Sequence, residues 1–173
     1  MPNIWLISDT HFGHENIIKY ADRPFINVRE MDEALIENWN RLVRPSDHVY
    51  HLGDVYMGRH DRNSISNILY RLNGHKRLIV GNHDEIKDVV LHRHFAKISM
   101  MRVFREYNLV LTHVPVHPNS LELTKGHVVN VHGHIHQHKS PPGPYINVCV
   151  EWTDYTPVNI EDIAAKAKKL LTD

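Results

Sequence analysis

Short runs of branched apolar residues alternate along this chain with segments in which apolar positions recur every three or four residues. Turn-forming or polar residues bound the short runs, so we predict strands at 3–8, 48–54, 76–84, 97–104, 107–112, 128–134 and 146–152. The intervening periodic segments predict helices at 14–21, 28–44, 61–72, 85–93 and 159–171. This alternation of strands and helices is typical of an α/β fold.

Two of the predicted helices carry signals at their ends. Asn27 can cap the helix at 28–44, and Pro45 closes it. Asn159 can cap the helix at 159–171, where acidic residues occupy the first turn and lysines lie toward the end. That charge order matches the helix dipole and supports the boundaries of this helix.

Size and charge narrow the classes of protein to consider. The chain has 173 residues, of which 42% are hydrophobic and 23% charged, so we expect one soluble domain over 1–173. Twenty basic residues balance 20 acidic ones, which disfavours a dedicated DNA or RNA binder but leaves room for a local basic patch. The chain has no apolar stretch of membrane-spanning length and no basic, apolar secretion signal near Met1. We therefore expect a cytoplasmic protein with no membrane partner.

The cysteine and the tryptophans suggest packing rather than chemistry. Cys149 is the only cysteine, so it forms no internal disulfide, and we expect it as a small core residue on the strand at 146–152. Trp5, Trp39 and Trp152 fit core or near-core packing better than a platform for stacking nucleotide bases.

Histidine is the unusual residue, with 16 in the chain, and polar side chains able to bind metal follow five of the predicted strands. They are Asp9 and His11, Asp54, Asn82 and His83, His113, and His134 and His136. Sites in α/β proteins form beyond the carboxyl ends of strands, and residues two apart on extended backbone face the same side. Imidazole nitrogens together with carboxylate and amide oxygens suit Mn, Fe, Zn or Co, and so many ligands suit two ions that share a carboxylate. A tetrathiolate zinc site is excluded, because the cysteines are lacking.

The ordered blocks Asp9-Thr-His11, Gly53-Asp54, Gly81-Asn82-His83-Asp84, Thr112-His113 and Gly133-His134-Ile135-His136 resemble those of the calcineurin-like metallophosphoesterases. The stretch SDTHFGHENIIKYADRPF (8–25) resembles a compact bacterial and phage subgroup of that family. The resemblance implies two packed mixed β-sheets flanked by helices, in four αββα layers. It also implies two divalent transition-metal ions, with Mn, Fe, Zn and Ni as candidates. Asp9, His11 and His136 would hold one ion, Asn82, His113 and His134 the other, and Asp54 would bridge them.

The mechanism implied by this resemblance is hydrolysis of a phosphate ester. Two ions about 3.5–4 Å apart make hydroxide available from a bridging water near neutral pH, and the hydroxide attacks phosphorus. His83 would stabilise the developing charge or protonate the departing oxygen, and Asp84 would orient the imidazole of His83.

Simpler interpretations exist for each residue alone. His134 and His136 could be a polar strand end, while Asp54 and Asn82 could serve turns, but their shared context favours a site. We interpret His51 as a strand residue rather than a ligand. His14 could contact metal or substrate, or cap the helix that follows. Candidate phosphate or base contacts are Arg23, Arg59 and Lys139, although a solvated surface cation is the favoured interpretation of each.

The predicted substrate is a small phosphate ester, with nucleotides among the candidates. Phosphodiesters such as cyclic nucleotides are preferred, because this short chain has no large insertion to close over a monoester. A nuclease of the same superfamily is an alternative, and it would require a basic groove beside the metals and a salt-sensitive reaction. A phosphomonoesterase is a second alternative. A non-catalytic scaffold is a third, and the intact ligand set argues against it. The chain lacks the HxHxDH motif of the metallo-β-lactamase fold, because His138 occupies the position where that motif has Asp.

Overall fold

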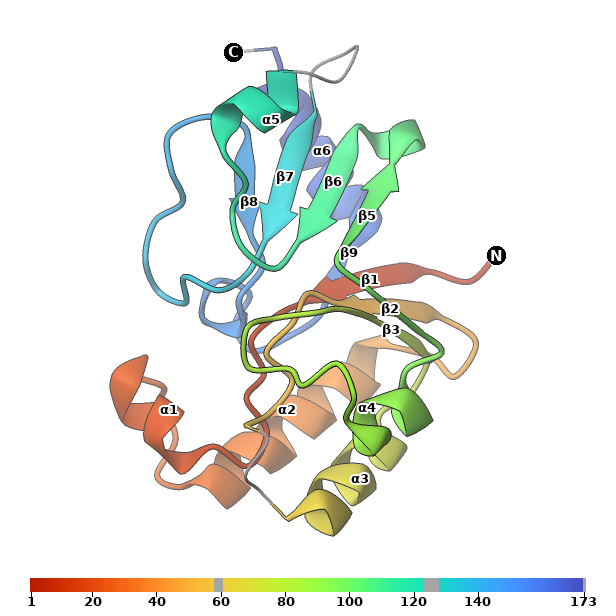
Figure 1. Ribbon diagram of the computed structural model, residues 1–173, viewed down its shortest axis with the longest axis vertical. Helices are drawn as coiled ribbons and strands as arrows, with labels where there is room; N and C mark the ends of the chain where they lie inside the picture. Colours follow the sequence, from red (N-terminus) through yellow and green to blue (C-terminus); the bar gives the residue numbers. More distant parts are fainter. Residues whose placement is uncertain (58–60, 123–127, 173) are drawn as a thin grey trace.

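In the computed structural model, which describes residues 1–57, 61–122 and 128–172, two β-sheets pack together with helices around them (Figure 1). The first sheet has the order β4-β3-β2-β1-β9 and the second the order β5-β6-β7-β8. The strands of the first sheet are β1 (Ile4–Ile7), β2 (His48–His51), β3 (His75–Ile79), β4 (Lys97–Ser99) and β9 (Val158–Asn159). Those of the second are β5 (Met101–Phe104), β6 (Leu109–Thr112), β7 (Val129–His132) and β8 (Tyr145–Asn147).

Both sheets are mixed, which confirms the predicted architecture. Strands β1 to β4 pair in parallel, and β9 is antiparallel to β1. In the second sheet β6, β7 and β8 pair in parallel, and β5 is antiparallel to β6. Parallel strands end at the same edge of their sheet, so the segments that follow β1, β2 and β3 leave the first sheet side by side.

The helices in the described ranges are α1 (Glu15–Tyr20), α2 (Val28–Leu42), α3 (Arg62–Arg71), α4 (Val89–His94), α5 (Pro118–Glu122) and α6 (Ile160–Leu170). The predicted caps are confirmed: the side chain of Asn27 accepts a hydrogen bond from the Glu30 N–H, and that of Asn159 accepts one from the Glu161 N–H. Among the described residues, no helix combines the length and the apolar character that crossing a membrane requires.

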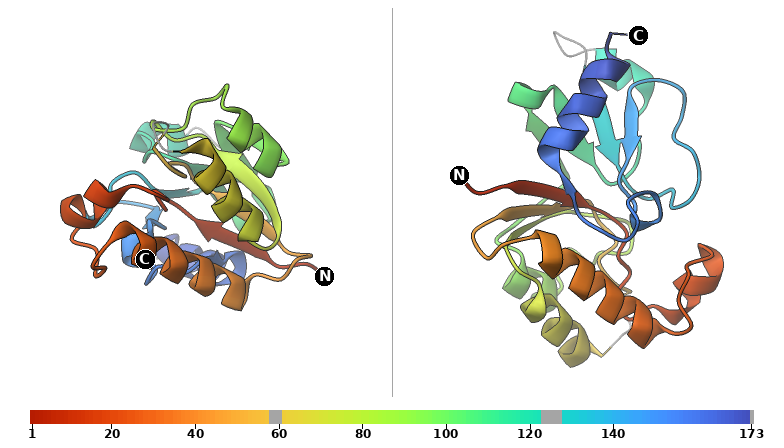
Figure 2. Two further views of the ribbon diagram at one scale, coloured as in Figure 1. Left: turned by 90° about the horizontal axis from the view of Figure 1, so that it is seen from below. Right: turned by 180° about the vertical axis from the view of Figure 1, so that it is seen from behind.

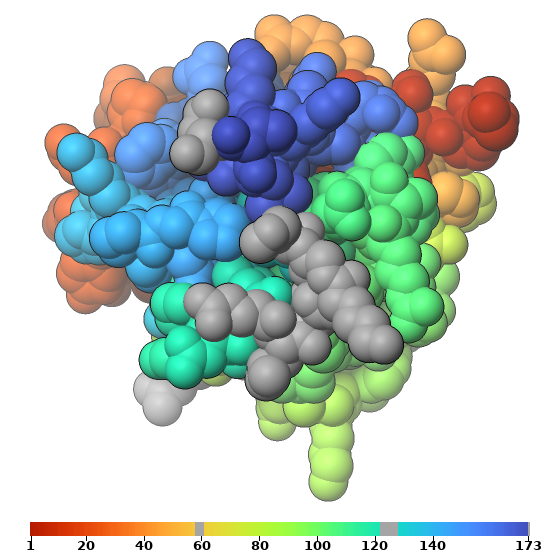
Figure 3. Space-filling view, turned by 90° about the horizontal axis from the view of Figure 1, so that it is seen from above, coloured from red at the N-terminus to blue at the C-terminus, as the bar shows by residue number. Residues whose placement is uncertain are grey.

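The two larger of the three apolar cores among the described residues lie on opposite sides of the first sheet, because neighbouring residues of a strand face opposite sides. Ile7 on β1 faces α2, α3 and α4, which cover one side of the first sheet. Leu6, on the same strand, joins the core between the sheets. That second core also includes Leu111 of β6 and Ile163 of α6. Helix α6 lies behind the second sheet (Figure 2), and from above it borders the segment that includes β8 (Figure 3).

Several boundaries differ from prediction. The predicted strand 97–104 divides at Met100 into β4 and β5, which belong to different sheets. The predicted strand 146–152 ends at Asn147, and Val150–Trp152 form a 3₁₀ turn. Cys149 is buried as expected but lies beyond the strand, and Trp152 is 49% exposed, so its predicted core position is wrong. Arg59 lies outside the described residues.

Candidate metal centre

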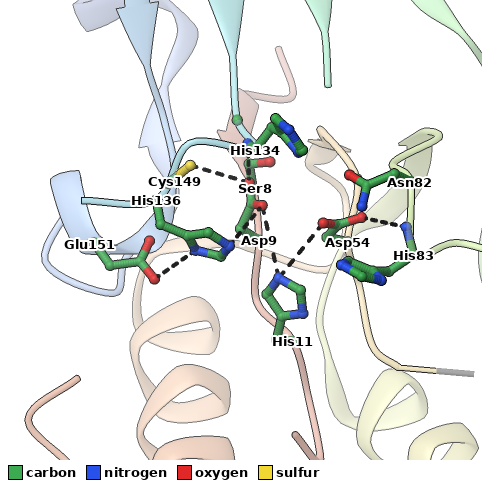
Figure 4. A network of polar contacts seen from close by, with 12 residues as sticks. Ser8, Asp9, His11, Asp54, Asn82, His83, His134, His136, Cys149 and Glu151 are labelled. Carbon is green, nitrogen blue, oxygen red and sulfur yellow. Dashed lines mark hydrogen bonds and ion pairs between the residues drawn. The ribbon is translucent and has the colours of Figure 1, made fainter. Parts of the chain in front are cut away.

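The polar residues that follow β1, β2, β3, β6 and β7 meet at the junction of the two sheets (Figure 4). Their side chains form two groups, Asp9 with His11 and His136, and Asp54 with His113 and His134. Within each group one ligand atom per residue lies within 4.8 Å of the others. The side-chain oxygen of Asn82 lies 2.9 Å from Nε2 of His113, at the edge of the second group. The structure thus brings together all seven residues that the sequence suggested as metal ligands.

Five of these residues have a left-handed backbone. The φ angles are +59° at Asp9, +50° at His11, +55° at Asp54, +70° at His134 and +47° at His136. Each such residue other than glycine or asparagine costs about 1–3 kcal/mol, and strain of this kind clusters at functional sites. Asp9 and His11, and likewise His134 and His136, therefore point into the site because the backbone turns tightly at these residues. The extended backbone expected from the sequence is not what directs them there.

Glycines let the loops approach closely enough to form these groups. A Cβ on Gly53, whose φ is +96°, would lie 2.6 Å from both the Gly81 nitrogen and Nδ1 of His113. A Cβ on Gly81 would overlap the Asp54 carboxylate, and one on Gly133 would overlap the Asp9 carboxylate. These three glycines are therefore needed for the close packing of the candidate ligands.

The first group contains buried polar atoms that have no hydrogen-bond partner among the described residues. These are Oδ1 of Asp9 and both ring nitrogens of His11. Oδ1 of Asp9 and Nε2 of His11 are 3.9 Å apart. Burial raises the pKa of Asp9 and holds the pKa of His11 well below its ordinary value. A carboxylate oxygen and a neutral imidazole nitrogen turned toward one point fit a divalent cation, which would compensate the unsatisfied atoms.

Asp54 lies between the two groups. Its Oδ2 is 3.7 Å from Nε2 of His11 and 3.4 Å from Nε2 of His113. Its Oδ1 accepts a hydrogen bond of 2.9 Å from the backbone N–H of His83. Burial by itself would raise the pKa of Asp54, but the hydrogen bond and charge of His113 bring it below its ordinary value. Asp54 therefore stays an anion in the position of a bridging ligand.

Hydrogen bonds orient two of the imidazoles. Nδ1 of His113 lies 2.7 Å from the Leu52 carbonyl, which can only accept, so this nitrogen carries a proton and Nε2 faces the site. Nδ1 of His136 likewise donates to Glu151 at 3.1 Å, and its Nε2 is 3.8 Å from Oδ1 of Asp9. Such partners fix the tautomer and direction of a metal-binding histidine.

Arg23 supports this arrangement from the interior. Its side chain is buried, so the favoured prediction of a solvated surface cation is wrong. Its guanidinium donates to the carbonyls of Asp9 (2.7 Å) and Thr10 (2.9 Å) and to Glu151 (2.7 and 2.9 Å), and it contacts Met31 Sδ at 3.4 Å. These contacts occupy all five guanidinium donors, which leaves none for a substrate. Arg23 is therefore placed to hold the backbone of Asp9 and the carboxylate of Glu151.

His83 and His14 lie beside the candidate ligands. The His83 side chain is solvent-exposed, and its ring centroid is 5.7 Å from that of His11. The ring centroid of His14 is 5.6 Å from that of His11. His14 is the N-cap residue of α1, but its side chain makes no capping hydrogen bond. Both rings are thus close enough to the first group to meet a bound substrate.

Asp84 has a different role from the one predicted. Its carboxylate accepts hydrogen bonds from the backbone N–H groups of Asp54 (2.9 Å), Val55 (3.0 Å) and Gly81 (2.8 Å). Burial raises the pKa of Asp84 to about 6 in spite of these bonds. The carboxylate therefore joins the loops that follow β2 and β3, rather than orienting the His83 ring.

Two further residues near the centre were missed in the sequence. Glu151 lies 128 positions from Arg23, and no motif surrounds it. The Cys149 thiol donates to Oδ2 of Asp9 at 3.2 Å, and burial raises its pKa, so it remains protonated. The local sequence of each residue is that of an ordinary buried segment, so only the fold identifies them.

Comparisons with known proteins agree with this geometry. Residues 2–172 match the family model of the calcineurin-like phosphoesterases. The chain is 38% identical to the uncharacterized protein MJ1445 of Methanocaldococcus jannaschii, over 98% of this chain and 93% of that protein. It is 34% identical to the gene 66 protein of Mycobacterium phage L5, over 49% of this chain and 41% of the phage protein.

Solved structures show the same fold. A protein of unknown function from Aquifex aeolicus, AQ665, superposes with a TM-score of 0.74 at 28% identity and covers 94% of this chain and 98% of its own. Pseudomonas putida nuclease MPE superposes with a TM-score of 0.50 at 19% identity, covering 77% of this chain and 61% of its own. Together with the family match over nearly the whole length, the two ligand groups assign the chain to the calcineurin-like phosphoesterases, hydrolases that act on phosphate esters.

Proposed function

We propose that the chain hydrolyses phosphodiesters, with nucleotide-type diesters as the favoured class, by means of two divalent transition-metal ions. Asp9, His11 and His136 would hold one ion, Asn82, His113 and His134 the other, and Asp54 would bridge them. The observation that carries this proposal is the position of Asp54, whose Oδ2 faces an imidazole nitrogen from each group. When bound, such a pair of ions activates water and neutralises phosphate charge.

The exposure of the site supports a diester rather than a monoester. The side chains of Asn82, His83 and His134 are exposed, although Asp9, His11 and Asp54 are buried. A phosphodiester carries an organic group on each of two ester oxygens, and a site with a buried floor and an exposed rim leaves room for both. The resemblance to Pseudomonas putida nuclease MPE also supports a diester with nucleotide groups.

His83 is suited to transfer a proton to the leaving group. Its backbone N–H is bound to Oδ1 of Asp54, so its ring is attached beside the buried carboxylate while remaining in solvent. Water oxygen forms its bond to phosphorus and releases one proton to solvent, while the bond from phosphorus to the leaving oxygen breaks. The leaving oxygen takes a proton from a ring nitrogen of His83, which regains one from solvent. A neutral alcohol and a phosphate monoester are the products.

The test is a comparison of esters on protein stripped with a chelator and reloaded with Mn, Fe, Zn or Ni. We expect bis-p-nitrophenyl phosphate to be hydrolysed faster than p-nitrophenyl phosphate with at least one of these metals, and no turnover of either by the stripped protein. Cyclic mononucleotides, cyclic dinucleotides and oligonucleotides then extend the panel. Faster hydrolysis of the monoester would refute the diester preference, and full activity without metal would refute the metal centre.

A further inference from the structure

The loop that follows His136 also forms one wall of a cavity. This cavity has a volume of about 460 Å³ and lies between that loop, β8, Trp152 and α6. Its wall includes Lys139 and Ser140, which follow the candidate ligand by three and four residues. Figure 3 shows the corresponding segments of the chain bordering each other on the upper face.

Hydrogen bonds join this cavity to the candidate metal centre. The indole N–H of Trp152 donates to the His136 carbonyl at 2.7 Å. The side-chain amide of Asn147 donates to the same carbonyl at 3.1 Å and to that of His138 at 3.4 Å. Trp152 and Asn147 both line the cavity. A ligand in this cavity and a ligand at His136 would therefore contact the same loop.

All of the charged residues that line the cavity are positive. Lys139, Lys166 and Lys169 line it, and none of the other lining residues is acidic. Within the described part of the chain, none of the three forms an ion pair with a carboxylate within 4.0 Å. Lys169 in the last turn of α6 also complements the helix dipole, but Lys139 is in a loop and has no such role. In a chain with no net charge, these lysines make a local site for anions.

Trp152 adds an aromatic surface at the same place. Its ring is held at one edge by the bond to His136, yet the residue is 49% exposed. An indole with a fixed position and free area is a platform on which a base can stack, and stacking combined with lysine contacts is how proteins bind single-stranded nucleic acid.

We propose that this cavity binds nucleotides adjacent to the scissile phosphate of a single-stranded nucleic acid. The proposal rests on the proposed phosphodiester hydrolysis and names its substrate class. A single strand is favoured over a duplex because stacking on Trp152 requires a base whose face is not already covered by its neighbours. The lysines of the cavity would then provide the basic groove that a nuclease requires, although the chain as a whole has no net charge.

The experiment uses metal-loaded protein and a fluorescein-labelled ten-nucleotide phosphorothioate oligothymidylate, whose linkages are hydrolysed slowly. Fluorescence anisotropy gives the binding constant at several salt concentrations. Each lost phosphate contact lowers the salt slope by about 0.7 for single strands. The double variant Lys166→Gln/Lys169→Gln should therefore lose about 1.4 of the slope, and Trp152→Ala should weaken binding by about 5- to 150-fold.

Neighbouring lysines provide a matched control. Lys168 lies on the same helix but lines a different hollow with Glu106, and Lys97 lies on the edge strand β4. Lys97→Gln/Lys168→Gln should leave the salt slope unchanged. The control double variant Lys97→Gln/Lys168→Gln should also hydrolyse bis-p-nitrophenyl phosphate as the wild type does, since neither lysine is a candidate ligand or lines the cavity.

The outcomes separate this proposal from the proposed function. Equal slopes for the two double variants, or equal binding of a duplex through Lys166 and Lys169, would overturn the single-strand site. Hydrolysis of the small diester without binding of the oligonucleotide would overturn this site and leave the phosphodiesterase proposal standing. Binding through the two lysines without hydrolysis of any diester would support the site and refute the proposed function.

Discussion

The substitution Glu151→Gln removes one buried negative charge while keeping the shape of the side chain. The side chain of Glu151 is 5% exposed and that of its partner Arg23 is fully buried. Removing one member of a buried ion pair costs about 3–5 kcal/mol, because the remaining charge is left uncompensated. Arg23 keeps the carbonyls of Asp9 and Thr10, and the new amide oxygen can still accept its bonds. We therefore expect the lower end, a loss of about 3 kcal/mol in the free energy of unfolding.

The same substitution should affect the two proposed ions unequally. Glu151 accepts the Nδ1–H of His136, whereas Nδ1 of His113 bonds to the Leu52 carbonyl. The amide oxygen of Gln can still accept the bond from His136, but the negative charge beside the imidazole is lost. Mutation of such a partner of a metal-binding histidine typically lowers metal affinity about 10- to 100-fold, equivalent to about 1.4–2.7 kcal/mol. Only the ion at Asp9, His11 and His136 should bind more weakly.

The assay combines urea unfolding with a titration of bound metal against a chromogenic chelator. Glu37→Gln, at an exposed position of α2, is the control and should match the wild type in both measurements. Equal weakening of both ions, or no weakening of either, would refute the reasoning that Glu151 acts through His136.

Three other predictions follow from the contacts of single residues. His83→Ala should retain both ions in a metal analysis but lower kcat by about 10²- to 10⁴-fold, the range for a lost general acid, and unchanged turnover would exclude its proposed role. Gly133→Ala should release the ion beside Asp9, since its Cβ would overlap the Asp9 carboxylate; a full metal complement would contradict this. His51, whose pKa burial lowers to about 3, must stay neutral in the folded chain. In the unfolded chain this histidine takes up a proton below its ordinary pKa of about 6.5. The free energy of unfolding is therefore highest above pH 6.5 and falls by about 2 kcal/mol as the pH is lowered to 5. Urea unfolding at pH 8 and pH 5 should show a smaller fall for His51→Gln, and an equal fall would exclude this histidine as the cause.

Periodicity was sufficient to predict the larger elements of the fold. The helix predicted at 28–44 and the caps at Asn27 and Asn159 depend on local features, and the structure confirms them. The division at Met100 could not be predicted, because a chain that passes directly from one sheet to another presents one continuous strand-like run. Strand β9 has two residues and α5 five, too few to produce a recognisable period.

The candidate ligands could be located from the sequence because each follows a strand within a short motif. The groups that support them could not, since their partners depend on how distant loops approach. Asp84 is next to His83 in sequence, yet its carboxylate meets the backbone of Asp54. In the sequence Arg23 looks like a surface cation. In the fold, a distant 3₁₀ turn packs beside it and brings Glu151 into an ion pair with it. The exposure of Trp152 is likewise a property of the assembled fold.

The proposed role of Asp54 is to bridge two metal ions held by the two ligand groups. Electron paramagnetic resonance of the manganese-loaded protein tests it most directly, because two Mn²⁺ ions about 3.5–4 Å apart are magnetically coupled. We expect two ions per chain with the spectrum of a coupled pair, and loss of that coupling in Asp54→Asn. A single ion per chain, or two ions with uncoupled spectra in the wild type, would contradict it.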